Sequence, residues 1–236
     1  MDARLPLVLR APNRPRSPNR RHTRDARPPP LAFQDHGSNT MRRKITSLLL
    51  GLGLVGGTVL AATGSAQGHG YTDSPVSRQQ LCGNGTVRGC GQIQWEPPSV
   101  EGLKGFPARG PVDGTICAGG NGRFSELDDP RGGNWPATAL GAGRNHTFVW
   151  RITARHATTD FRYYVTKDGW DPTKPLTRAD LDPQPFLTVP FGGQRPGATV
   201  THTGVLPQKS GRHLILGVWN VADTGNAFYA CSDVTF

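Results

Sequence analysis

The sequence predicts an all-β fold: an antiparallel β-sandwich of immunoglobulin or fibronectin III type, with a long loop-rich, short-helix insertion near its N-terminus. Segments in which apolar and polar residues alternate follow one another through the C-terminal half of the chain. Glycine, proline, asparagine and aspartate separate these segments. The stretch before them, 70–143, is rich in glycine and proline and has little periodicity. Several short alternating strands with this spacing are typical of a sandwich.

The residues before this domain have a different composition. Residues 1–40 contain eight arginines and seven prolines and no apolar periodicity, so we expect a disordered or non-native upstream extension. Residues 41–68 combine a basic start, an apolar run at 47–62 and small residues before a cut after Gly68, as in a secretory signal peptide. A transmembrane helix is the alternative, but the run is short and glycine-rich. We therefore predict that 69–236 is a single secreted, extracellular domain.

Two features of this leader stay open from the sequence. Translation can start at Met1 or at Met41, and the pair Arg42 and Arg43 is compatible with either Sec or twin-arginine export.

Most of the positive charge of the chain lies in residues 1–68. The formal net charge is +10, but residues 69–236 contain 16 basic and 14 acidic residues, a net of only +2. A nucleic-acid partner therefore loses its electrostatic support. We expect no nucleic acid, no membrane contact after processing, and a monomer.

All four cysteines lie in the predicted domain, and export favours disulfides. Four cysteines allow three connectivities. We favour Cys82–Cys90, which closes a short glycine-rich loop, and Cys117–Cys231, which ties the insertion to the last strand. A zinc site is the rival, but the CxxC spacing is missing.

The alternating segments give the expected strands in chain order. They are 147–155, 161–167, 186–189, 198–206, 213–221 and 227–236. Only a short turn, 156–159, separates the first two, so we predict that they form an antiparallel hairpin.

Cleavage after Gly68 would make His69 the first residue of the mature chain. An N-terminal histidine offers two nitrogen donors, the α-amine and ring Nδ1, which can chelate one metal ion. A second histidine opposite would complete a planar set of three nitrogens, and nitrogen ligands in tetragonal geometry suit Cu(II).

Four histidines in the domain are candidates for this partner. His146 precedes a strand, His202 lies within one and His213 opens another, and for these a surface or structural role is favoured. His156 lies at the tip of the predicted hairpin, where a side chain can project from a rigid sheet into open space. From position alone, a surface role for His156 remains the alternative.

Ordered motifs along the whole domain resemble those of the bacterial chitin-active lytic polysaccharide monooxygenases, auxiliary activity family 10. They are HGY at 69–71, SPVSR at 74–78, WEP at 95–97, SVEGLKGFP at 99–107, FSELD at 124–128, TARH at 153–156, FRYY at 161–164, PLTR at 175–178, GVW at 217–219 and DTGNAFY at 223–229. Motifs this numerous and in this order are highly specific, whereas a leading His-Gly alone would be weak.

The resemblance implies roles for individual residues. His69 and His156 match the two histidines that hold one copper ion, which cycles between Cu(II) and Cu(I). Ala154 and Phe228 match the residues on its two axial sides, and Glu101 matches the carboxylate that positions the oxygen species. The matched polysaccharide-contacting surface comprises Trp95, Glu96, Pro97, Glu101, Asp223 and Asn226. Taken without the family, Phe228 would be a core residue, Glu101 a surface carboxylate and Trp95 an exposed ring.

The implied activity is oxidative cleavage of β-1,4 bonds in crystalline chitin, with oxidation at C1, using O2 or H2O2 and an external electron donor. A non-catalytic chitin-binding protein, a periplasmic copper carrier and a cellulose-active relative are the alternatives. One departure concerns disulfides: relatives place one near the positions of Leu187 and Gly204, where this chain has no cysteine.

Overall fold

The computed structural model describes residues 68–236; the predicted extension and signal peptide, apart from Gly68, lie outside the described residues. Two β-sheets face each other, so the predicted sandwich is confirmed. The three-stranded sheet has the order β1-β4-β7 and consists of β1 (His69–Ser74), β4 (Asn145–Ala154) and β7 (Thr199–Val205).

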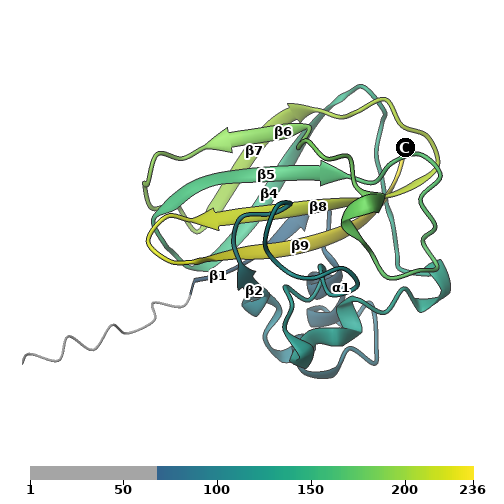
Figure 1. The fold of residues 1–236 in the computed structure, drawn as a ribbon, viewed down its shortest axis with the longest axis horizontal. Coiled ribbons are helices and arrows are strands. Elements are labelled where there is room, and N and C mark those ends of the chain that lie inside the picture. Colours follow the sequence, from purple (N-terminus) through teal and green to yellow (C-terminus); the bar gives the residue numbers. More distant parts are fainter. Residues whose placement is uncertain (1–67) are drawn as a thin grey trace, which may run out of the picture. The chain divides into compact units, whose positions relative to one another are not determined.

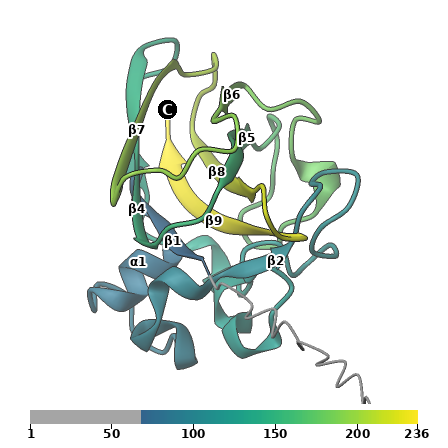
Figure 2. The ribbon, with the colours of Figure 1, turned by 90° about the vertical axis from the view of Figure 1, so that its left-hand side faces the viewer.

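The second sheet has six strands in the order β2-β9-β8-β5-β6, with β3 pairing in parallel with β9. Its strands are β2 (Glu101–Leu103), β3 (Thr138–Ala139), β5 (Thr158–Val165), β6 (Leu187–Pro190), β8 (Arg212–Val221) and β9 (Asn226–Thr235). Figure 2 shows β4 and β7 on one side of the sandwich and β5, β8 and β9 on the other.

The predicted insertion contains short helices connected by loops. They are α1 (Arg78–Gly83) and the 3-10 helices η1 (Gly91–Trp95), η2 (Pro97–Ser99), η3 (Gly122–Leu127) and η4 (Arg131–Gly133); a fifth, η5 (Arg178–Asp180), follows later in the chain. Among residues 68–236 no helix has both the length and the hydropathy to cross a bilayer.

The core is divided by the six-stranded sheet, because successive side chains of a strand point to opposite faces. Tyr163 of β5 belongs to the cluster between the two sheets, and its neighbour Tyr164 belongs to the cluster beneath the insertion. Between the sheets, Phe161 stacks on Trp219 with ring centroids 6.0 Å apart. Both faces of this sheet are therefore covered, and in Figure 1 α1 and the loops around it lie beside β2 and β9.

Covalent and ionic contacts fix the insertion to the sheet. The disulfides Cys82–Cys90 and Cys117–Cys231 are both present, as predicted. Arg78 of α1 donates from Nε to Asp233 Oδ2 of β9 at 2.7 Å, and both side chains are almost fully buried. Loss of one partner of such a pair costs about 3–5 kcal/mol, so α1 is held firmly on β9.

Two expectations about the strands are wrong. The segments 147–155 and 161–167 do not form a hairpin: β4 pairs with β1 and β7, whereas β5 pairs with β6 and β8. The three residues 155–157 between them cross from one sheet to the other. The second is that no strand precedes residue 147, whereas β1, β2 and β3 all lie before it; β1 forms a strand by pairing with β4.

Leu187 and Gly204, the positions at which the resemblance implies a disulfide, are packed together. A β-carbon on Gly204 would lie 2.8 Å from Cδ2 of Leu187, so the two positions are neighbours. In this chain the contact is between leucine and glycine.

Candidate functional site

Strand register brings four of the predicted site residues to one end of the sandwich. His69 opens β1 and is paired with Ala154, the last residue of β4. Glu101 opens β2 and is paired with Phe228 of β9. Gly70 lets β1 approach the core closely, because a β-carbon there would lie 3.0 Å from the carbonyl oxygen of Arg151.

The peptide unit before His69 lies against His156 and Phe228. A β-carbon on Gly68 would lie 2.8 Å from Cδ2 of His156 and 2.7 Å from Cε2 of Phe228, closer than carbon atoms normally approach. The backbone nitrogen of His69, which is bonded to the carbonyl of Gly68, is thus near the His156 ring. The backbone of His69 and the ring of His156 are therefore adjacent.

His156 is buried, which corrects the expectation that it projects into open space from a hairpin tip. Its exposed fraction is 3%, and its Nδ1 lies 3.1 Å from Oδ1 of Asp223. An ionised carboxylate can only accept a hydrogen bond, so Nδ1 is the donor in this contact. Burial raises the pKa of Asp223, but the hydrogen bond and charge of His156 outweigh it and hold the pKa below the ordinary value.

Lys104 fixes the loop that carries Asp223. Its backbone N–H donates to the carbonyl of Gly225 at 3.0 Å. Its Nζ donates to the carbonyl of Val221 at 3.0 Å and also to that of Thr224. The loop is therefore tied on both sides of Asp223 to the residue that follows β2. Lys104 lies in the SVEGLKGFP motif at 99–107, but the sequence alone assigns it no role.

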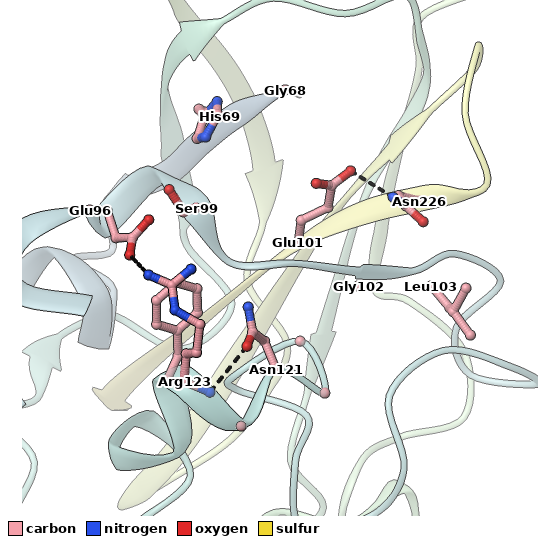
Figure 3. A pocket seen from close by; sticks show the side chains of 14 residues that line it. Gly68, His69, Glu96, Ser99, Glu101, Gly102, Leu103, Asn121, Arg123 and Asn226 are labelled. Carbon is pink, nitrogen blue, oxygen red and sulfur yellow. Dashed lines mark hydrogen bonds and ion pairs between the residues drawn. The ribbon is translucent and has the colours of Figure 1, made fainter. Parts of the chain in front are cut away.

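A cavity of about 550 Å³ opens beside His69. Figure 3 shows the His69 ring on one side, Glu101 and Asn226 on another, and Asn121 on a third. Asn226 Nδ2 donates to Oε1 of Glu101 at 2.8 Å. Asn121 Oδ1 accepts from the backbone N–H of Arg123 at 3.1 Å, so its amide nitrogen is turned toward the cavity. The cavity thus carries both donors and acceptors.

Of the predicted contact surface, Glu96, Glu101 and Asn226 line this cavity, whereas Trp95, Pro97 and Asp223 do not. Trp95 is 77% exposed, as expected for a ring that could stack on a sugar. Glu96 pairs with Arg123, and Pro97, which opens η2, is half-buried. Asp223 is exposed and Asn226 is half-buried. Sequence reasoning missed Asn121 and Arg123, which no recognisable pattern marks.

Phe228 and Ala154 differ in how deeply they lie. Phe228 is fully buried and packs on Trp219 with ring centroids 4.8 Å apart, as its expected core character implies. Ala154 is half-buried at the strand end.

The other candidate histidines have structural partners. His146, half-buried within β4 rather than before it, lies 3.2 Å from Ser74 Oγ through Nε2. His202 Nδ1 lies 2.7 Å from the hydroxyl of Tyr163, and burial lowers the pKa of His202 to about 4. His213 Nδ1 lies 3.0 Å from Thr166 Oγ1. Of the four candidates, only His156 is adjacent to His69.

Side chains alone do not build a metal site in this structure. Within 68–236, no group of three or more histidine, cysteine, aspartate or glutamate side chains has metal-binding geometry. Two imidazoles need a third donor from the backbone, and the nitrogen of His69 is the one beside them.

Comparison with known proteins identifies the family. The family model described as lytic polysaccharide mono-oxygenase, cellulose-degrading, matches residues 69–234. A GlcNAc-binding protein A from Shewanella oneidensis is 44% identical over 82% of this chain and 41% of its own length. An AA10 family lytic polysaccharide monooxygenase C from Mycosarcoma maydis is 45% identical over 71% of this chain and 52% of its own length. The chain thus spans about half, or less, of these curated relatives.

Solved structures match the domain along nearly their whole length. An AA10 lytic polysaccharide monooxygenase from Streptomyces lividans is 63% identical, with a TM-score of 0.70, over 71% of this chain and 100% of that chain. A Bacillus amyloliquefaciens CBM33 in complex with Cu(I) is 38% identical, with a TM-score of 0.63, over 71% and 99%. The chain therefore belongs to the AA10 family of lytic polysaccharide monooxygenases.

Proposed function

We propose that the mature chain is a secreted, copper-dependent enzyme that oxidatively cleaves β-1,4 bonds of crystalline chitin, with oxidation at C1. The observation that carries the proposal is the contact between the Gly68–His69 peptide unit and His156. Cleavage after Gly68 would convert an amide nitrogen, whose lone pair is delocalised into the carbonyl and which is a poor metal ligand unless it loses its proton, into an amine with an available lone pair.

The donor chemistry fits copper. The α-amine and Nδ1 of His69 and Nε2 of His156 make three neutral nitrogens, a set that suits copper better than magnesium or calcium. Asp223 accepts from Nδ1 of His156 and so fixes which ring nitrogen is offered. The relative from Bacillus amyloliquefaciens, solved with Cu(I), supports the same metal here.

When bound, copper would supply the redox chemistry. An external reductant provides electrons, and O2 or H2O2 provides the oxygen for oxidation of an unactivated C–H bond. The chain supplies positioning. Ala154 and Phe228 offer only a methyl group and a ring edge, which add no further ligand. Glu101, with Oε1 held by Asn226, would use its second oxygen to accept a hydrogen bond from H2O2 when that is the co-substrate.

The exposed residues around the cavity suit a flat, neutral polymer. Glu96 and Asn226 line the cavity and can form hydrogen bonds to hydroxyl and acetamide groups. Outside its lining, the exposed Trp95 can stack on a sugar ring, and Pro97 and Asp223 offer further contacts. The relatives named GlcNAc-binding protein A favour chitin. Cellulose is the second candidate, because the matching family model is described as cellulose-degrading.

The test uses three versions of residues 69–236: one that starts at His69, one with an additional Gly-Ser before His69, and His156→Ala. Each is loaded with Cu(II), given ascorbate and incubated with β-chitin or with cellulose, and the soluble products are analysed by mass spectrometry. We expect aldonic-acid ends from chitin with the first version alone. We also expect copper affinity, measured by calorimetry, to fall by orders of magnitude in the other two.

The possible failures are distinct. Binding to chitin without new oxidised ends would make the chain a non-catalytic binding protein. Oxidised ends from cellulose alone would correct the substrate. Unchanged turnover in His156→Ala would refute the site itself.

A further inference from the structure

A second hollow continues from the cavity at His69. It has a volume of about 250 Å³ and shares Leu103, Gly119 and Gly120 with the first. Leu103 and Val112 line it and are 66% and 67% exposed. Single exposed apolar residues are ordinary on protein surfaces, but two that flank one hollow beside a polar site indicate a binding surface.

The position of Leu103 on β2 directs it to the same side as the site. Residues two apart in a strand share a face, so Leu103 points to the side of Glu101. Leu103 is also paired with Asn226, as Glu101 is with Phe228. Figure 3 shows Leu103 on the far side of Glu101 from His69.

The second hollow is uncharged. Its remaining lining consists of Gly110, Pro111, Thr115, Gly119 and Gly120. An anionic polymer or a lipid headgroup would find no cation among these residues. A neutral ligand with small apolar groups fits them better.

The backbone around Val112 is held in place before any ligand binds. The hydroxyl of Thr115 donates to the carbonyl of Val112 at 2.8 Å, and the N–H of Gly120 donates to the carbonyl of Thr115 at 2.9 Å. Gly102 lies so close to Gly119 that a β-carbon on it would meet the Gly119 carbonyl oxygen. A preformed surface loses little entropy on binding.

We propose that Leu103 and Val112 form an apolar shelf that receives acetamide methyl groups of the chitin chain next to the cleaved bond. The inference rests on the proposed function and deepens it. Branched aliphatic side chains suit a methyl group, whereas the flat face of a sugar suits the Trp95 ring. Cellulose has hydroxyl groups in place of the acetamides, so the shelf favours chitin.

The experiment measures binding of the copper-free protein that starts at His69 to β-chitin and to cellulose. The variant carries Leu103→Ser and Val112→Ser. The control is Val205→Ser, which changes a residue that is 61% exposed and lies on β7. We expect the double variant to bind chitin about tenfold more weakly, roughly 1.4 kcal/mol. Its affinity for cellulose and for Cu(II), and its melting temperature, should stay within error of wild type.

Each possible result either supports or overturns the proposed shelf. A loss confined to chitin and absent from Val205→Ser supports the shelf. An equal loss on both polymers, or no loss on chitin, overturns it. If the wild-type protein itself binds cellulose and not chitin, the proposed substrate is wrong, and the shelf is overturned with it because cellulose has no acetamide methyl groups to receive.

Discussion

Replacing Asp223 by alanine tests how His156 is held. The carboxylate accepts from Nδ1 at 3.1 Å. A hydrogen bond to a charged group contributes about 1.5–3 kcal/mol. The Asp223 side chain is 42% exposed, so solvent screening favours the lower end of that range. We expect Cu(II) affinity to fall about tenfold, roughly 1.4 kcal/mol, because the ring can then rotate or present the other nitrogen.

The measurement is a competition titration of Cu(II) on protein that starts at His69. Asp171→Ala is the matched control, because Asp171 is 43% exposed and also takes part in a surface ion pair, with Lys174. Asp223→Asn, which keeps an acceptor without the charge, should lie between wild type and alanine. Equal affinities for Asp223→Ala and wild type, or the same loss in the control, would show that this contact does not orient the ligand.

Two further predictions concern stability. Burial raises the pKa of Asp128 to about 6 against the pull of two backbone N–H donors, so the folded state binds its proton more tightly than the unfolded state does. Its contribution to stability is present below about pH 4 and is lost as the pH rises through 6. Asp128→Asn should therefore raise the free energy of unfolding at pH 7.5 by about 1–2 kcal/mol after allowance for partial exposure, and the gain should vanish near pH 4. Urea titrations at both values measure this, and a gain that grows toward acid would contradict it. Replacing Cys117 and Cys231 by serine opens a loop whose ends are 114 residues apart and should cost about 4–5 kcal/mol. The same change at Cys82 and Cys90, 8 residues apart, should cost about 2–3 kcal/mol in the same titration; equal losses would count against the loop-entropy account.

Local pattern predicted the later strands closely, because alternation reflects which face of a strand is buried. The expected segment 147–155 is β4 (Asn145–Ala154) to within two residues. Alternation carries no information about the partner strand, so the sequence predicts a hairpin where the chain crosses from β4 to β5. The polar sequence of β1 does not predict a strand, because this segment becomes a strand through its pairing with β4.

The site shows the same division between local and long-range information. His69 could be predicted from the processing signal before it, and His156 through the resemblance to the family. The contacts made by Lys104 could not, since they join residues 117 and 120 positions apart in the chain. Those packing relations appear in the folded molecule and not in any short motif.

Gly68 also bears on when the enzyme becomes competent. Before the proposed cleavage, this residue fills the space beside the His156 and Phe228 rings. The precursor would then be latent for two reasons: its future amine is an amide, and the backbone of Gly68 lies against the ring of a proposed ligand, His156. Proteolysis would remove both obstacles in a single event. Acquisition of the metal would thus be confined to the far side of the export step, and the cytoplasm would be spared an active oxidant.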